Sequence, residues 1–423
     1  MATDYLAITE HNITQLGLDT RSRRSQVTMY SDSTHFIFEL LQNADDYGAT
    51  EVSFDLQPDR LIFSHNGIPF SEANVKAITY FGRSTSAEDL VKTGRFGVGF
   101  KSVFAFTATP IIFSGEEHFR IHDLYKLDAV QPPADIDRSR TYITLPFNHH
   151  KYEPDYVEDH ISAADAFGKI SKRLKSLDKK TILFTRNIKT IYWSVGKQAG
   201  HYRRKDDLHD SYRISSVADE VAGNTERFLV FQKDVEIGGE EYKPVEVAFY
   251  LNKKKQIKRG ASVLYVLFAT IQETHLQFLI NGPFRTNPSR ESIAYDDDFN
   301  LHLIGLVSDL WETILETLKT EGMLTMQVFD VLPQEEDALP EFYHPIQERI
   351  YDLLRKQAFL PAADGTFVRA QEGVMGAKAI RQVFSNEDIS FFLKKDCKWL
   401  QGVSATSRAG RLLQALEVPR WSW

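Results

Sequence analysis

Residues 39–46 have the sequence ELLQNADD, and this stretch decides the expected fold. Around it, Ile37, Leu41 and Ala44 form an apolar stripe with the spacing of one helix face. The residues just before the stripe, 30–33, read YSDS and are typical of a capped helix start. The pattern therefore predicts a helix with one apolar face.

The same helix carries a polar face. Glu39, Asn43 and Asp46 stand at i, i+4 and i+7, so two carboxylates and an amide share one side. Such a face can polarise a water molecule and offer an oxygen ligand to Mg²⁺, which prefers hard oxygen donors. An ordinary solvated helix face has the same pattern. The residues alone leave both interpretations open.

Strand and helix patterns alternate through the next hundred residues. Residues 57–60 read QPDR, a turn that predicts a hairpin between the strands on either side. His65-Asn66-Gly67 stands at the end of the second strand and is by itself an ordinary turn sequence. Strands are expected at 51–56, 61–63, 110–114 and 142–145, and a helix is expected at 71–81.

A glycine-rich run, GRFGVGFKS at residues 94–102, follows a polar stretch of small residues at 82–93. Glycines allow backbone N–H groups to turn toward a phosphate, and a following helix N-terminus favours an anion. The spacing is not that of a Walker loop. The run also does not directly follow a strand, as a Rossmann fingerprint would.

In order and spacing, the acidic-amide helix, Asn66-Gly67, the glycine run and Thr141 resemble the Bergerat fold of the GHKL ATPase superfamily. The resemblance is closest to the N-terminal and middle domains of the ninety-kilodalton heat-shock chaperone and to sacsin-like ATP-binding proteins. It covers residues 1–150, and similar segments at 278–293 and 359–368 extend it to about residue 370. The resemblance implies an Mg²⁺-dependent ATPase, expected to be slow.

The resemblance also implies a role for each matching residue. Glu39 would be the general base, Asn43 would ligate Mg²⁺, and Asp46 would support the adenosine side of the pocket. Arg290, in the Ser-Arg-Glu sequence at 289–291, would contact the terminal phosphate, although the same three residues suit an ordinary helix start. The other residues that would bind ATP are His65, Asn66, Gly67, Ser84, Thr85, Gly94, Arg95, Phe96, Gly97, Val98, Gly99, Phe100, Lys101 and Thr141.

One position departs from the superfamily. Where this chain has His65, the superfamily usually has an aspartate that accepts a hydrogen bond from the adenine amino group. A neutral histidine can accept through one ring nitrogen, but only in the right tautomer. Asn66 could serve instead through its amide oxygen. Base specificity is therefore open at this position.

The composition is that of an ordinary globular protein. Of the 423 residues, 42% are hydrophobic and 26% charged, which suits two or three domains of about 100–200 residues each. One cysteine excludes a disulfide scaffold and a zinc site made of several thiolates. No signal sequence is recognisable, and the longest strongly apolar run, 261–271, is too short to span a bilayer. We therefore expect a cytoplasmic protein without membrane contact.

The expected fold class is α+β. A helix-over-sheet ATP domain of the Bergerat type at 1–150 would precede an α/β middle (transducer) domain at 151–330 and a small helical C-terminal region at 331–423. The expected function is a chaperone- or sacsin-like module that binds and hydrolyses ATP with Mg²⁺. In such a module the nucleotide state drives closure of the lid at 82–93 and of the domains.

Two alternatives remain open. The first is an ATP-gated scaffold with little or no turnover, against which the presence of Glu39 argues. The second is the ATPase subunit of a nucleic-acid-processing or defence assembly. Basic clusters at 201–205 and 253–259 favour it, and the net charge of −8 opposes it. Expected partners are the nucleotide, a protein client or partner subunit, and a second copy of the chain in a homodimer.

Overall fold

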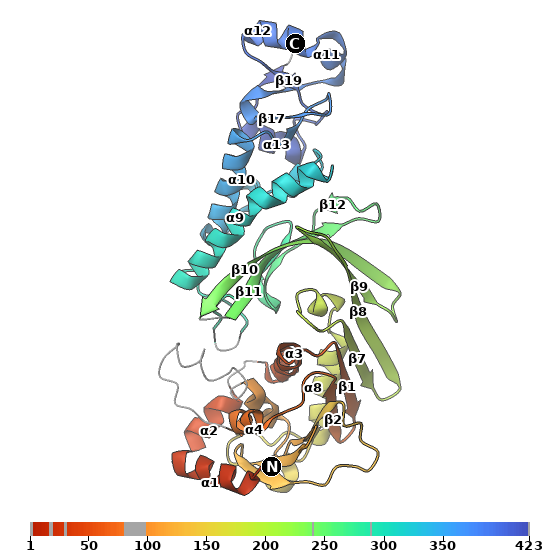
Figure 1. Cartoon of the computed structure of the whole chain (residues 1–423), viewed down its shortest axis with the longest axis vertical. Coiled ribbons are helices and arrows are strands. Elements are labelled where there is room, and N and C mark those ends of the chain that lie inside the picture. Colours follow the sequence, from red (N-terminus) through yellow and green to blue (C-terminus); the bar gives the residue numbers. More distant parts are fainter. Residues whose placement is uncertain are drawn as a thin grey trace. The chain divides into compact units, whose positions relative to one another are not determined.

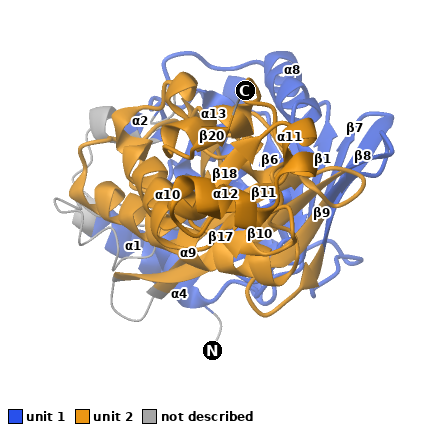
Figure 2. Ribbon diagram, turned by 90° about the horizontal axis from the view of Figure 1, so that it is seen from above, with its two compact units in different colours: residues 1–205, 217–225, 288–290 blue, residues 206–216, 226–287, 291–423 orange. Residues whose placement is uncertain are grey.

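The computed structural model describes residues 3–16, 20–28, 32–79, 99–238, 241–287 and 290–421. Figure 1 shows the elements along the chain, and Figure 2 shows the two compact units into which the chain divides. The first unit comprises Met1–Lys205, Val217–Thr225 and Pro288–Arg290. The second comprises Asp206–Ser216, Glu226–Asn287 and Glu291–Trp423. Arg290 therefore belongs to the first unit, although its neighbours on the C-terminal side belong to the second.

The first unit contains a mixed sheet with strands in the order β7-β1-β2-β6-β3-β4-β5. Its strands are β1 Glu51–Gln57, β2 Arg60–His65, β3 Ile111–Ser114, β4 Glu117–His122, β5 Lys126–Ala129, β6 Thr141–Pro146 and β7 Thr190–Val195. Its helices are α1 Tyr5–Leu16, α2 Thr20–Val27, α3 Phe36–Asp46, α4 Glu72–Thr79, α7 His149–Tyr152 and α8 Ala163–Lys175, with short 3₁₀ helices η1 Ser33–His35, η2 Lys101–Ala105 and η3 Lys179–Ile182. The helix around residues 39–46 and the β1–β2 hairpin are confirmed.

Alternation along β1 explains how this sheet is covered. Val52, Phe54 and Leu56 are buried, whereas the residues between them are only half-buried, so one face of the strand carries the core. The helix α8 packs near β1 and buries its own apolar side, including Ile170 and Leu174. The sheet is thus covered by helices mainly on its apolar face.

The second unit is built on long antiparallel strands and two packed helices. The strands β8 Gln198–Leu208, β9 Arg213–Asp219 and β10 Asn224–Gly238 have residues in both units. The unit continues with β11 Glu241–Leu251, β12 Ile257–Lys258, β13 Val263–Val266, β14 Phe268–Glu273, β15 Leu279–Asn281, α9 Asp298–Thr320 and α10 His344–Lys356. Figure 1 shows α9 and α10 side by side, and Trp311 of α9 is fully buried against Phe249 and Phe278. Aromatic packing of this kind supplies much of the unit's core.

The C-terminal region, predicted as a small helical region at 331–423, contains several helices and also short strands. Besides helices it contains a three-stranded sheet in the order β19-β18-β20 and the pair β16–β17. The elements after α10 are β16 Leu360–Pro361, β17 Phe367–Val368, β18 Gly373–Gly376, α11 Lys378–Val383, α12 Asn386–Leu393, β19 Lys398–Trp399, α13 Arg408–Ala415 and β20 Arg420–Trp421. Strands of two to four residues are too short to show the alternation by which a strand is recognised in sequence.

The second unit has one large apolar core that runs from β10 to α13 and includes Leu229, Trp311, Leu354 and Leu412. A smaller cluster around Trp399 lies under α11 and α12. The expected α+β class is confirmed, because the described residues combine a large mixed sheet with several helices. The division into functional domains at residues 150 and 330 stays a prediction. In the described part of the chain, no helix is both long and apolar enough to cross a membrane.

Candidate functional site

The helix α3 carries the candidate site, and its start is fixed by a local cap. Asp32 accepts a hydrogen bond from the backbone N–H of Thr34 at 2.8 Å and so caps the 3₁₀ turn η1 that leads into α3. The apolar stripe, including Ile37, Leu41 and Ala44, is fully buried. Tyr30 and Ser31, the other expected capping residues, lie outside the described residues.

Glu39 is buried and lies next to a cation. Its side chain is 2% exposed, and Arg290 Nη1 is 3.0 Å from Glu39 Oε1. The same Nη1 atom donates a hydrogen bond to Oε1 of Gln42, one turn along α3. His35, which precedes Glu39 by four positions, has its Nε2 atom 4.0 Å from Glu39 Oε1. Glu39 is therefore part of an interior polar cluster and not of a solvated helix face.

Gly99, the last glycine of the glycine-rich run, packs directly on the Glu39 carboxylate. A Cβ atom at position 99 would lie 1.8 Å from Glu39 Oε2, which no side chain can do without displacing it. Ser102 Oγ donates to the carbonyl of Gly99 at 2.6 Å and fixes the turn that follows. The general-base candidate and the end of the glycine run are thus neighbours, although 60 positions separate them in the sequence.

The remaining polar residues of α3 differ in burial. Asn43 is half-buried and Asp46 is exposed, so the predicted face rises from the interior at Glu39 to the surface. Asp45, which sequence reasoning did not single out, is 1% exposed. It accepts backbone N–H groups from Arg186, Asn187 and Ile188 at 2.8–2.9 Å. Asp45 therefore joins the end of α3 to the segment that leads into β7.

The end of β2 presents His65, which is 3% exposed. The backbone N–H of Gly67 donates to His65 Nδ1 at 3.1 Å. Burial, with a smaller contribution from the positive charge of Arg140, lowers the pKa of His65 to about 4. The ring is therefore neutral near pH 7, with Nδ1 as the acceptor and the proton on Nε2. A Cβ on Gly67 would lie 2.7 Å from the carbonyl oxygen of Tyr47, so this turn requires glycine.

The side chain of Asn66 bonds to the start of β1. Its Oδ1 accepts the backbone N–H groups of Thr50 and Glu51, both at 2.9 Å, and its Nδ2 donates to Thr50 Oγ1 at 2.8 Å. The amide oxygen considered as an alternative acceptor for the base is already bonded at the start of β1. His65 is therefore the strand-end side chain that remains for such a contact.

Thr141 lies directly beside His65. The two residues are paired across β2 and β6, and Ser114 is paired with Thr141 across β3 and β6. Thr141 is fully buried, and its Oγ1 is 2.5 Å from Ser114 Oγ, which also accepts the backbone N–H of Phe70 at 2.8 Å. Side chains of directly paired residues share one face of a sheet. His65, Thr141 and Ser114 thus form a polar row across three strands.

Phe100 and Lys101 follow Gly99 and are both buried. Lys101 is fully enclosed, and this burial lowers its pKa to about 7, so charged and neutral forms coexist near neutral pH. The rest of the predicted phosphate-binding segment lies outside the described residues: Ser84, Thr85, Gly94, Arg95, Phe96, Gly97 and Val98.

The side chains around α3 could supply only part of the ligand shell of a Mg²⁺ ion. Within the described ranges, no group of three or more His, Cys, Asp or Glu side chains could hold a metal ion. Mg²⁺ commonly takes only one or two protein oxygens and completes its octahedron with waters and substrate phosphates. The half-buried Asn43, one turn after Glu39, is compatible with that mode.

Comparisons with known proteins find a family match in the first part of the chain. Residues 20–127 match the family model described as the Sacsin domain, and this segment contains α3, the β1–β2 hairpin and the glycine-rich run. The matched segment is sacsin-like, which confirms that part of the expected resemblance. The closeness to the ninety-kilodalton chaperone and the wider GHKL superfamily stays a prediction.

Individual relatives extend the similarity. The chain is 26% identical over 312 residues to Protein NO VEIN of Arabidopsis thaliana, a match that covers 65% of this chain and 11% of that protein. It is 33% identical over 117 residues to human Sacsin, covering 24% of this chain and 3% of Sacsin. The chain thus spans a small part of the length of either relative. A crystal structure of the N-terminal domain of a DNA repair protein aligns with a TM-score of 0.35 and 12% identity, over 62% of this chain and 88% of that one.

Sequence reasoning missed three contributors to the site. Gln42 contacts Arg290, Asp45 holds the backbone before β7, and Ser114 extends the polar row at Thr141. Gln42 and Asp45 lie inside the quoted motif, so their presence was visible and only their partners were not. Ser114 ends a predicted strand, and only the pairing of β3 with β6 shows that it faces Thr141.

Proposed function

We propose that the first unit is a Bergerat-type module of the GHKL superfamily that binds ATP with Mg²⁺ and hydrolyses it slowly, in a sacsin-related role. The observation that carries the proposal is the position of Glu39. A carboxylate that is 2% exposed lies against the last glycine of the glycine-rich run and 3.0 Å from an arginine. A surface carboxylate would need neither a glycine nor a cation at that distance.

The chain's own residues would divide the work as follows. Glu39 would accept a proton from the attacking water, which its burial keeps apart from bulk solvent. Asn43 would offer an amide oxygen to Mg²⁺, whose chemistry when bound is to neutralise phosphate charge. Gly99 and the preceding glycines would turn backbone N–H groups toward the phosphates. Thr141 and His65 would meet the base at the end of the polar row.

Arg290 would move between two anions. It pairs with Glu39 in the structure, and a guanidinium also matches phosphate oxygens. In the proposed cycle it would leave Glu39 for the terminal phosphate, which frees the base and stabilises the developing charge in the same step. The expected lid at 82–93 lies outside the described residues, and in this proposal the nucleotide state also controls closure of the domains. A protein client, a partner subunit or a second copy of the chain would respond to that closure.

The same ion pair favours a second candidate, the ATP-gated scaffold. While Arg290 Nη1 is paired with Glu39 Oε1, that oxygen is occupied by the guanidinium and is less available to contact an attacking water molecule. If Arg290 stays on Glu39 when ATP is bound, the module would bind nucleotide and turn it over barely or not at all. Turnover measured beside binding separates the two candidates.

Calorimetric titration of the full chain with ATP tests the proposal. Binding is expected with Mg²⁺ and is expected to be lost in Asn43→Ala or with a chelator, because Asn43 is the proposed metal ligand. Asn74→Ala is a suitable control, since Asn74 bonds to Tyr47 and Ser71 and lies outside the proposed metal site. If neither Asn43→Ala nor the chelator changed ATP binding, the proposed role of Asn43 as a metal ligand would be contradicted. The absence of any binding would contradict the proposed function.

A further inference from the structure

We propose that the nucleotide pocket of the first unit prefers a purine with an oxo group at position 6 over adenine, and that His65 sets this preference. The inference rests on the proposed function, because it assumes that the end of the polar row faces a base. The inference states which base the pocket prefers. It follows from the hydrogen bond that fixes the tautomer of the His65 imidazole.

The contact with Gly67 determines which nitrogen of His65 carries the proton. A backbone N–H can only donate, and Gly67 donates to Nδ1 at 3.1 Å. Nδ1 must therefore be the unprotonated nitrogen of a neutral ring, and Nε2 must carry the hydrogen. The ring is buried, which also favours the neutral form.

Gly67 cannot easily give up this position. Its backbone packs closely against the turn that follows α3, since a Cβ there would lie 2.7 Å from Tyr47 O and 3.0 Å from Ala49 N. The next residue, Ile68, donates its N–H to Tyr47 O at 2.8 Å. The donor that selects the tautomer is thus held by the same backbone that ends α3. His65 offers an N–H group at Nε2, for which the described residues provide no assigned acceptor.

The neighbouring hydroxyl groups can adapt, whereas His65 cannot. Thr141 and Ser114 share a hydrogen bond in which either oxygen can be the donor. Thr141 can therefore donate to a base or accept from it by rotating its hydroxyl hydrogen. Discrimination between bases must then come from the fixed donor at His65.

The two purines differ in what they offer to a donor. Adenine carries an amino group at position 6, which is itself a donor, whereas guanine and hypoxanthine carry an oxygen acceptor there. A donor facing an amino group leaves a poorly solvated N–H without a partner, and this costs more than one ordinary hydrogen bond contributes. Adenine can still bind through a ring nitrogen. We therefore expect a preference of about tenfold, not exclusion of ATP.

Competitive titration of the full chain with ATP, ITP and the triphosphate of unsubstituted purine riboside tests the inference, all with Mg²⁺. ITP differs from ATP at position 6, and the unsubstituted purine provides a reference without a group there. ITP is expected to bind about tenfold more tightly than ATP. Equal binding, or tighter binding of ATP, overturns the inference and leaves the proposed function intact. If none of the three binds, the proposed function fails and the inference fails with it.

A variant reverses the chemistry at the same place. In His65→Asp the carboxylate still accepts from Gly67 but presents an acceptor to the base, so ATP is expected to bind more tightly than ITP. His118→Asp serves as a matched control, because His118 is a partly buried strand histidine that bonds to Gly115 O and should leave the ratio unchanged. A His65→Asp variant that keeps the wild-type ratio overturns the inference.

The tautomer can be measured without any variant. Two-bond ¹H–¹⁵N correlation spectra of the imidazole distinguish a protonated from an unprotonated ring nitrogen. The expected result for His65 near pH 7 to 8, where burial keeps the ring neutral, is an unprotonated Nδ1 and a protonated Nε2. The opposite tautomer would overturn the inference even if the His65→Asp variant failed to fold.

Discussion

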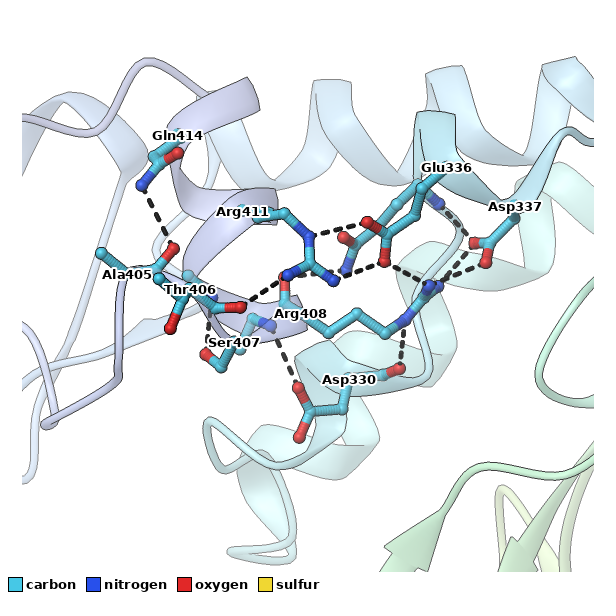
Figure 3. Close-up of polar contacts among 12 residues, drawn as sticks. Asp330, Glu336, Asp337, Ala405, Thr406, Ser407, Arg408, Arg411 and Gln414 are labelled. Carbon is cyan, nitrogen blue, oxygen red and sulfur yellow. Dashed lines mark hydrogen bonds and ion pairs between the residues drawn. The ribbon is translucent and has the colours of Figure 1, made fainter.

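Two arginine–carboxylate contacts, one in each unit, differ in how completely the arginine is bonded. In the second unit Arg408 donates to Asp337 through both terminal nitrogens, at 2.7 and 2.5 Å. It also donates to Glu336 and to the carbonyls of Asp330 and Leu332, as Figure 3 shows in part. All five donors of this guanidinium have acceptors. In the first unit both contacts of Arg290, to Glu39 and to Gln42, use the single nitrogen Nη1.

The two arginines also differ in solvent exposure. The side chains of Arg408 and Asp337 are each 6% exposed, whereas that of Arg290 is 29% exposed beside a Glu39 at 2%. Arg290 also has a φ of 56°, in the left-handed region that non-glycine residues rarely adopt. A saturated, buried arginine stabilises one arrangement, and an arginine bonded through one nitrogen can exchange partners. The comparison predicts different consequences when each contact is removed.

The largest expected effect is on turnover in the first unit. Glu39→Gln keeps the shape that packs on Gly99 but removes the base, so hydrolysis is expected to fall by about 10²–10⁴-fold with ATP binding retained. Phosphate release measured beside calorimetric binding checks this. Asp55→Asn, on a carboxylate of β1 that bonds to Gln57, is the control. Hydrolysis of Glu39→Gln at the parent rate would assign Glu39 a structural role only.

The contact in the second unit should matter for stability and not for turnover. Arg408→Ala leaves Asp337 buried without its cation, which typically costs about 3–5 kcal/mol. Urea unfolding should show this loss, while hydrolysis per folded molecule stays the same. Arg411→Ala is the matched control, because its pair with Glu336 is solvent-exposed and should contribute little to stability. A loss no larger than that of Arg411→Ala would show that Arg408 is less important than its bonding suggests.

The smallest expected effect comes from the exchangeable arginine. Arg290→Ala should lower kcat by about 10–10³-fold with little change in ATP affinity, because Mg²⁺ and the loop amides would still hold the phosphates. Arg285→Ala, an exposed arginine just before it in the sequence, should leave kcat unchanged. Faster hydrolysis in Arg290→Ala would mean that the arginine inhibits Glu39 as a base. That result would support the ATP-gated scaffold over the ATPase.

The parts of the fold that repeat a pattern over several turns or strands could be predicted from the sequence. The helix α3 follows from the spacing of Ile37, Leu41 and Ala44, and the β1–β2 hairpin follows from its turn at 57–60. The short C-terminal strands β18–β20 could not be predicted, because two to four residues carry no periodic signal. Their existence depends on partners brought together by tertiary packing.

The site could be predicted as a set of residue types but not as a set of contacts. Sequence spacing selected Glu39, Asn43 and Asp46, whereas Asp45 is the carboxylate whose hydrogen bonds hold α3 in place. A shift of one residue turns a helix by about 100°, and the partners of Asp45 are more than 140 positions away. The tautomer of His65 likewise depends on one backbone N–H, which no pattern in the sequence encodes.

The bonds of Asp45 also set a time order for making the first unit. Their donors, Arg186–Ile188, and the strand β7 that pairs in parallel with β1, leave the ribosome after the whole of residues 1–150. At about 5–20 residues per second, roughly 7–30 s pass between the synthesis of Asp45 and that of its partners. Until then, the Asp45 carboxylate, which is buried in the folded unit, lacks these hydrogen bonds, and the edge of β1 that pairs with β7 stays open to other chains. A fragment that ends at residue 150 would lack these partners, so we expect it to be less stable than a fragment that extends past Val195.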